Sequence, residues 1–240
     1  MIQENHQCGK CGSINIIYNG HNQCGSPQYR CKDCGTCRVL KPKSKTQSID
    51  LEALERAYLE RNSDRAVARI FNISHTTVSR LLKKKARELP DFKSTVIEPK
   101  AEEAVEADEV YSYVLSKKNP IRIWIALNKS NKQILSFLIG DGTMKSRQKF
   151  WRKRPYEWLR QPSFSDLLQS YNCIPKETHT KVGKGTGLTN HIERLNNTIR
   201  QRFARLVRKT LSFSKKVYML NLHFKYWAYH YNLQIQNNST

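Results

Sequence analysis

The spacing of apolar residues is most regular between Asn190 and Lys209, where it predicts a helix. Apolar side chains recur there at steps of three and four residues, which places them on one buried stripe. The stripe consists of Ile192, Leu195, Ile199, Phe203, Leu206 and Val207. The residues that share a neighbouring face are Glu193, Asn196, Asn197 and Arg200.

Glu193 is an isolated carboxylate, because residues 194–216 contain eight Lys or Arg and no Asp or Glu. Two interpretations fit this pattern. With Asn190 it matches a capping box, in which the carboxylate accepts a backbone N–H at the helix start. Alternatively, it binds a divalent metal ion while the basic residues hold a polyphosphate chain against that ion.

Further upstream the pattern changes to that of strands. Three β-rich segments separated by short turns predict an antiparallel meander over residues 110–115, 121–127 and 133–139. Asp108 stands at the entry of the first strand. It also follows the acidic residues Glu102, Glu103 and Glu106, so composition alone would make it the last member of a solvated linker.

After the meander, residues 142–154 are predicted to be helical and basic. Asp166 precedes a short apolar stretch, where an aspartate is an N-cap as readily as a metal ligand. A last helix begins at Val217 and reaches Tyr231, and its aromatic stripe predicts a core position.

Residues 51–88 predict three short helices, with Ser63 or Asp64 capping the second and Ser74 the third. Two short helices joined by a tight turn, with a basic second helix, are the helix-turn-helix pattern, although a structural three-helix bundle has the same pattern. In a helix-turn-helix, the residues facing the major groove would be His75, Thr76, Thr77, Ser79 and Arg80. Those contacting phosphates would be Lys83, Lys84 and Lys85.

The cysteines are concentrated near the start of the sequence. Two Cys-x-x-Cys pairs are separated by nineteen residues, and a glycine follows each pair, as the turn requires. Two such pairs predict a zinc ribbon around one tetrahedral Zn²⁺, whereas a redox motif needs only one pair. The predicted ligands are Cys8, Cys11, Cys31 and Cys34. Cys24 or Cys37 could replace one of them.

The charge balance narrows the class of partner. A net charge of +22 and a pI of about 9.9 favour a polyanion. Nucleic acid fits better than a membrane, since the sequence has neither an apolar run of spanning length nor a signal peptide at its polar start. An odd total of seven cysteines argues against a disulfide framework and favours a reducing, cytosolic compartment.

The order of these features resembles the DDE transposases of the insertion-sequence-one family, and the resemblance covers nearly the whole chain. The strongest match is residues 192–196 running into residues 205–215. The other matches are the cysteine pairs with residues 28–32, residues 108–113 with the turn at 117–119, and Ala126-Leu127.

This resemblance implies a multidomain fold. The implied parts are a zinc ribbon (1–40), a three-helix helix-turn-helix domain (41–90), a linker (91–106) and an α/β RNase H-like catalytic domain (107–240). In the last of these, a mixed sheet would start with the antiparallel three-strand meander.

The resemblance also implies the chemistry. The triad would be Asp108, Asp166 and Glu193, holding two Mg²⁺ or Mn²⁺ ions for DNA cleavage and strand transfer. The partners would be double-stranded DNA, at terminal inverted repeats and target, and further copies of the chain in a homodimer or larger assembly at the bacterial nucleoid, in the cytoplasm. The implied phosphate contacts are Arg194, Arg200, Arg205 and Lys209.

The sequence departs from the family around the middle acid. An Asp-Gly-Trp-like turn is usual there, and Ser165-Asp166-Leu167 lacks the Gly and the Trp. Asp141, just after the third predicted strand, is therefore a competing middle acid. The alternative function is a catalytically inactive DNA-binding regulator derived from such an element.

Overall fold

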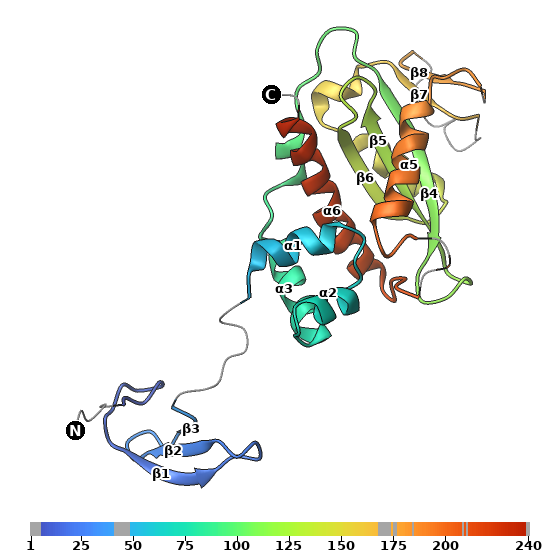
Figure 1. Ribbon diagram of the computed structural model, residues 1–240. Helices are drawn as coiled ribbons and strands as arrows, with labels where there is room; N and C mark the ends of the chain where they lie inside the picture. Colours follow the sequence, from blue (N-terminus) through green and yellow to red (C-terminus); the bar gives the residue numbers. More distant parts are fainter. Residues whose placement is uncertain are drawn as a thin grey trace. The chain divides into compact units, whose positions relative to one another are not determined.

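The computed structural model describes residues 6–40, 49–167, 174, 177–183, 185–207, 209 and 211–238. The chain divides into two compact units, Met1–Ile49 and Asp50–Thr240 (Figure 1). Among the described residues, no helix is long and apolar enough to cross a membrane.

The smaller unit is a three-stranded antiparallel sheet made of β1 (Ile16–His21), β2 (Pro27–Cys31) and β3 (Cys37–Arg38), in that order. Two similar tight turns bring its cysteine pairs together. In one, the N–H of Gly12 donates to the carbonyl of Cys8 at 2.8 Å, and in the other that of Gly35 donates to Cys31 at 2.9 Å. Both glycines have a positive φ, +73° and +69°, which explains why glycine follows each pair.

The larger unit begins with three helices, α1 (Leu51–Leu59), α2 (Asp64–Ile70) and α3 (His75–Glu88). Each helix starts with a capping side chain, Asp50, Ser63 or Ser74, which accepts the backbone N–H three residues further on. The three predicted helices are therefore confirmed, and Ser63 rather than Asp64 is the cap of the second. Their apolar faces meet at Leu54, Val67, Val78 and Leu82, all at most 1% exposed.

A mixed five-stranded sheet follows, in the order β6-β5-β4-β7-β8. The antiparallel part is β4 (Val105–Tyr113), β5 (Pro120–Asn128) and β6 (Ile134–Gly140), which confirms the predicted meander. The short strands β7 (Ser163–Ser165) and β8 (His179–Lys181) extend it in parallel from β4. β4 begins at Val105, earlier than predicted, so Asp108 lies inside the strand instead of at its entry.

Helices cover both faces of this sheet. On one face, α5 (Asn190–Arg202), α6 (Val217–Asn237) and the short η1 (Phe92–Thr95) pack on Val110, Ile125 and other apolar residues (Figure 1). On the other face, α4 (Met144–Arg152) and η2 (Tyr156–Leu159) pack on Ala107 and Trp124. Because successive strand residues point to opposite faces, Glu106 and Asp108 share the α5 face with Val110.

The helix predicted over residues 190–209 ends at Arg202, because Phe203 adopts an extended conformation with φ −102° and ψ 101°. The apolar spacing continues past this point because Phe203 and Leu206 are still core residues, 2% and 4% exposed. A turn, closed by the N–H of Leu206 on the carbonyl of Phe203 at 2.9 Å, carries them inward in place of a further helical turn.

Candidate active site

Two strands bring two aspartates together on the α5 face of the sheet. Asp108 is in β4, and the parallel pairing of β4 with β7 places Ala107 opposite Ser165. The next residue on each strand is then Asp108 and Asp166, on the same face. Asp166, which directly follows β7, is partly exposed.

Helix α5 lies over this pair and adds Glu193 and Asn196, which are one turn apart and share a face of the helix. The amide Nδ2 of Asn196 donates to Oδ2 of Asp108 at 2.7 Å, which fixes the helix against the strand. The carboxylate of Glu193 is exposed, and its Oε1 accepts the Thr189 hydroxyl at 3.2 Å. Within the described residues, the buried Oδ1 of Asn196 has no hydrogen-bond partner.

The electrostatics of Asp108 reflect this crowding. Burial raises its pKa to about 7, and the charges of Glu109, Asp166 and Glu193 add to the rise against a backbone N–H of Glu109 that lowers it. The predicted acids are therefore near enough to interact through their charges. Among the described residues, however, the carboxylate oxygens of these three acids do not all lie within 4.8 Å of one another.

The start of α5 is capped by a residue that sequence reasoning missed. Glu106 is fully buried in β4, and its two carboxylate oxygens accept the backbone N–H of Ile192 and Nδ1 of His191, both at 2.8 Å. A carboxylate at this end of the helix is favoured by the helix dipole. The capping-box interpretation of Asn190 and Glu193 is wrong, because the N-cap is Thr189 and Glu106 accepts the N–H near the helix start.

The competing acid, Asp141, has a different role. Its Oδ1 accepts the Thr143 N–H at 3.1 Å, the Thr143 hydroxyl at 2.6 Å and the Ser146 hydroxyl at 2.5 Å, and these bonds lower its pKa. It follows β6, which is two strands away from β4, or about 10 Å at the usual strand spacing. Its charge is not among the main causes of the raised pKa of Asp108.

Comparison with known proteins identifies the group of proteins to which this site belongs. Residues 103–234, which include all three acids, match the model of the IS1 transposase family. The chain belongs to the IS1 transposase family. It is also 32% identical to the insertion element iso-IS1n protein InsB of Shigella dysenteriae over 113 residues, which cover 47% of this chain and 83% of that protein. The resemblance found in the sequence is thereby confirmed.

In this transposase-family chain, the predicted base-reading residues are on the first two turns of α3. His75, Thr76 and Arg80 are exposed, whereas Thr77 and Ser79 are half-buried. With Lys83 and Lys84, most of them line a groove of about 530 Å³. The Thr77 hydroxyl is 2.8 Å from that of Ser74, so it belongs to the helix cap.

The predicted phosphate contacts of the family's catalytic half differ in their surroundings. Arg194 and Lys209 are exposed. Arg200 donates to the carbonyl of Tyr111 at 3.2 Å, across from α5 to β4. Arg205 forms an ion pair with Asp64 at 3.2 Å, and its side chain is 15% exposed.

The four predicted metal-binding cysteines converge in the smaller unit. Their sulfur atoms all lie within 4.8 Å of one another, and the Sγ–Sγ distance is 3.6 Å for Cys8 with Cys34 and for Cys11 with Cys31. Tetrahedral thiolates at 2.3 Å from a zinc ion would be about 3.8 Å apart, so the cluster fits a zinc finger. Cys24 and Cys37 are exposed and lie outside the cluster.

Hydrogen bonds lower the pKa of one of these cysteines, Cys34. The hydroxyl and the backbone N–H of Thr36 lower the pKa of Cys34 to about 6. The pKa of Cys11 instead rises to about 12, since the neighbouring thiols and burial outweigh the lowering effect of the Ser13 N–H. Four thiolates so close together repel each other, and a bound cation would offset that repulsion. Cys173 lies outside the described residues.

Proposed function

We propose that the chain is a DDE transposase that binds the terminal inverted repeats of its insertion element and catalyses DNA cleavage and strand transfer. The observation that carries the proposal is that the charges of Asp166, directly after β7, and of Glu193, on α5, both act on the buried Asp108 of β4. Membership of the IS1 transposase family supports it.

The sheet supports an RNase H-like catalytic domain. Three antiparallel strands are followed by two parallel ones, and the first strand, β4, is central and carries the first acid. The pairing of β7 with β4 supports Asp166, which follows β7, as the second acid. We assign this domain to residues 107–240, preceded by a linker at 91–106, a helix-turn-helix domain at 41–90 and a zinc ribbon at 1–40.

The donor set fits Mg²⁺ or Mn²⁺, which prefer oxygen ligands, and a bound cation would favour the ionised form of Asp108, whose pKa burial and the neighbouring acids raise. Asp108, Asp166 and Glu193 would hold two such ions. When bound, these ions would activate the attacking hydroxyl and stabilise the leaving oxygen. Asn196 orients Asp108 through its hydrogen bond, and Thr189 orients Glu193.

The remaining residues bind DNA and keep the fold. The exposed face of α3 reads bases through His75, Thr76, Ser79 and Arg80, and Lys83 and Lys84 contact phosphates beside it. Arg194, Arg200 and Lys209 hold the DNA backbone near the acids, while one Zn²⁺ stabilises the ribbon.

Joining two element ends requires a dimer or larger assembly of the chain on DNA. We place this assembly at the nucleoid in the bacterial cytoplasm.

The test is metal-dependent cleavage and joining of an element-end duplex by the purified full-length protein. Wild type should act with Mg²⁺ or Mn²⁺, and Glu193→Gln should lose on the order of 100-fold or more in rate while it still binds the DNA. Asp141→Asn is the matched control and should keep its activity, because the Asp141 carboxylate accepts hydrogen bonds from Thr143 and Ser146 at the start of α4. Binding without cleavage by wild type, with either metal, would support the inactive regulator instead.

A further inference from the structure

A second groove, of about 830 Å³, lies between the helices α2 and α3 and the segment that connects α5 with α6. Helix α2 contributes Arg65 and Arg69, and α3 contributes Lys83 and Arg87. The connecting segment contributes residues 204–205, 211–213 and 215–216. All of these residues belong to the larger unit.

The lining of this groove is strongly cationic. It holds seven Lys or Arg side chains and one acidic side chain, Asp64, which is already paired with Arg205 at 3.2 Å. In the part of the chain that the structure describes, no ion pair joins Lys215 or Lys216 to an acid. Cations gathered in a concave surface create a focused positive potential, which attracts a polyanion.

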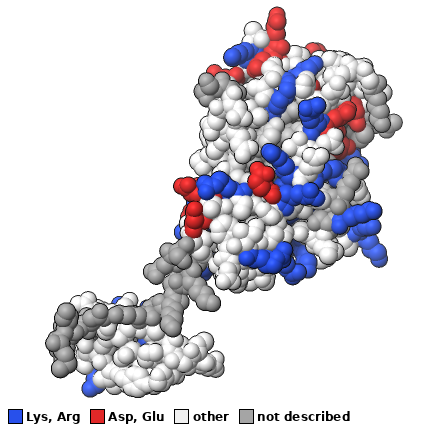
Figure 2. All heavy atoms as spheres, in the orientation of Figure 1, with Lys and Arg blue, Asp and Glu red and all other residues white. Residues whose placement is uncertain are grey.

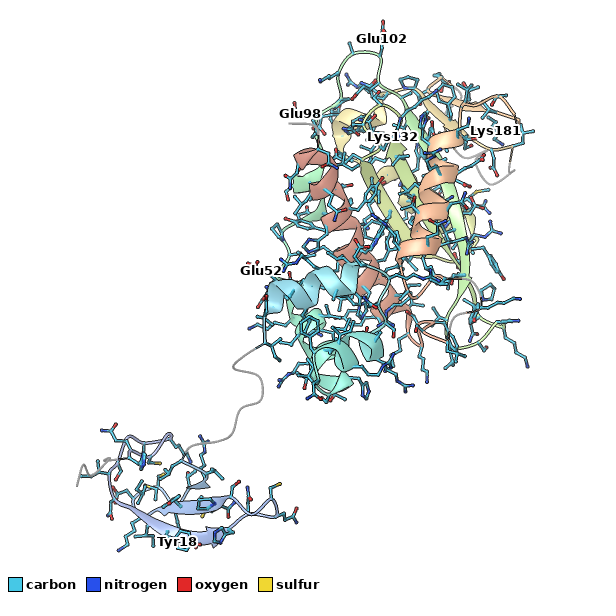
Figure 3. The ribbon with its side chains drawn as sticks, in the orientation of Figure 1. Tyr18, Glu52, Glu98, Glu102, Lys132 and Lys181 are labelled. Carbon is cyan, nitrogen blue, oxygen red and sulfur yellow. The ribbon has the colours of Figure 1, made fainter. Side chains whose placement is uncertain are left out.

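This groove is continuous with the face of α3 that reads DNA. His75, Lys83 and Arg87 line both grooves, so a duplex that contacts the first groove would extend its backbone towards the second. On the face shown in Figure 2, Lys and Arg side chains lie at the lower end of the larger unit, where α2 and α3 lie, and also further up, where acidic side chains lie among them.

The two sides of the groove are held together by buried contacts. The Tyr58 hydroxyl on α1 is 2.5 Å from Nδ1 of His223 on α6, and Nε2 of His223 is 3.0 Å from Arg205. The ion pair of Arg205 with Asp64 then reaches the start of α2. A groove fixed in this way loses little conformational freedom when a ligand binds.

We propose that this groove binds the phosphodiester backbone of the element-end duplex beside the bases that α3 reads. The inference rests on the proposed function, since its ligand is the same DNA. The connecting segment continues from α5, and the nine residues from Glu193 to the end of that helix span about 14 Å. The groove thus lies beyond the end of the helix that carries Glu193, and it links DNA recognition to cleavage.

The test compares full-length double variants that each remove two exposed cations. Lys215→Ala with Lys216→Ala changes the connecting segment, and Arg65→Ala with Arg69→Ala changes α2. The control is Lys145→Ala with Lys149→Ala on α4, which packs on the opposite face of the sheet and lines neither groove. Affinity for a random duplex and for an element-end duplex is measured against salt concentration.

Each groove variant should lower the slope of log K against log salt by about 1.8, since each phosphate contact contributes about 0.9. The control should keep the wild-type slope, and all three should keep the wild-type melting transition. A hydroxyl-radical footprint of the element-end duplex should lose protection of part of the sugar-phosphate backbone in the groove variants and keep it in the control. Unchanged slopes and footprints, or equal losses in the control, would overturn the proposal.

The outcome is separate from that of the proposed function. Glu193→Gln should lose cleavage but keep the wild-type slope of log K against log salt. The groove variants should have a smaller slope whether or not wild type cuts the DNA. If the groove variants instead change self-association in light scattering and leave the DNA slope unchanged, the groove holds an acidic protein segment, and the inference is wrong.

Discussion

Replacing Asp108 with Asn tests whether burial and the neighbouring acids raise the pKa of Asp108 in the folded chain. Burial raises the pKa of Asp108 from 3.8 to about 7, and the charges of Glu109, Asp166 and Glu193 contribute to that rise. Because the folded-state pKa is raised, the ionised carboxylate costs stability above pH 7. This cost diminishes as the pH falls through 7 towards 3.8.

The magnitude follows from a rise of about three pKa units, which corresponds to about 4 kcal/mol at pH 8 and about 2 kcal/mol at pH 5. Asn is neutral at both pH values and can still accept the hydrogen bond from Asn196. Asp108→Asn should therefore stabilise the larger unit relative to wild type at pH 8, and this advantage should shrink by about 2 kcal/mol at pH 5. The same variant should lose strand cleavage.

Urea unfolding followed by tryptophan fluorescence is the suitable assay, because all four tryptophans, at positions 124, 151, 158 and 227, belong to the larger unit. Asp141→Asn makes the same chemical change at a carboxyl group whose pKa is shifted in the opposite direction. Hydrogen bonds from Ser146 and Thr143 lower the pKa of Asp141, so its loss should destabilise the protein at pH 8. A stability difference between Asp108→Asn and wild type that is equal at pH 5 and pH 8 would refute the raised pKa of Asp108.

Three further predictions concern single contacts. Asn196→Ala should slow cleavage by about 10- to 100-fold, the worth of a hydrogen bond to a charged group, whereas the exposed Asn197→Ala should not. Metal analysis should find one Zn²⁺ per chain in wild type and in Cys24→Ser, and none in Cys31→Ser. Glu106→Ala should destabilise the larger unit by about 3 kcal/mol in urea unfolding, because two buried hydrogen bonds at the start of α5 are lost.

Features with a short-range cause were the ones that the sequence predicted best. The capping side chains at Ser63 and Ser74 act within three residues, and the two cysteine turns are each closed by a hydrogen bond over four residues. The strands of the meander are likewise joined by short turns. Their sequence patterns therefore contain most of the information that determines the local structure.

Features with a long-range cause were predicted less well. Glu106 follows two acidic residues and was grouped with a solvated linker, yet it is fully buried under a helix that begins 84 residues later. Its role depends on how β4 packs against α5, which no local pattern records. The local sign of its position is the valine and alanine that flank it, since Val105-Glu106-Ala107 alternates as a half-buried strand does.

Surface charge shows a similar limit. The sequence showed that residues 194–216 are basic, but not that Lys215 and Lys216 line a groove with Arg65 and Arg69, which are about 150 residues earlier. It also counted Arg205 among the phosphate contacts, whereas an ion pair with Asp64 occupies its guanidinium. Net charge predicts the sign of a partner, and only the fold shows which cations share one surface.

The choice of the middle acid depends on the same distinction. Asp141 and Asp166 both follow strands, and Asp141 is the nearer of the two to Asp108 in the sequence. Spacing along the chain therefore does not distinguish the two candidates reliably. The strand order supports the proposal of Asp166, since β7 pairs directly with β4 and β6 is separated from it by β5. A parallel neighbour also places the ends of both strands in register, which brings Asp166 level with Asp108 without the Gly and Trp of the family's usual turn. The missing turn residues therefore do not displace the acid, because its position is determined by the pairing of Ala107 with Ser165.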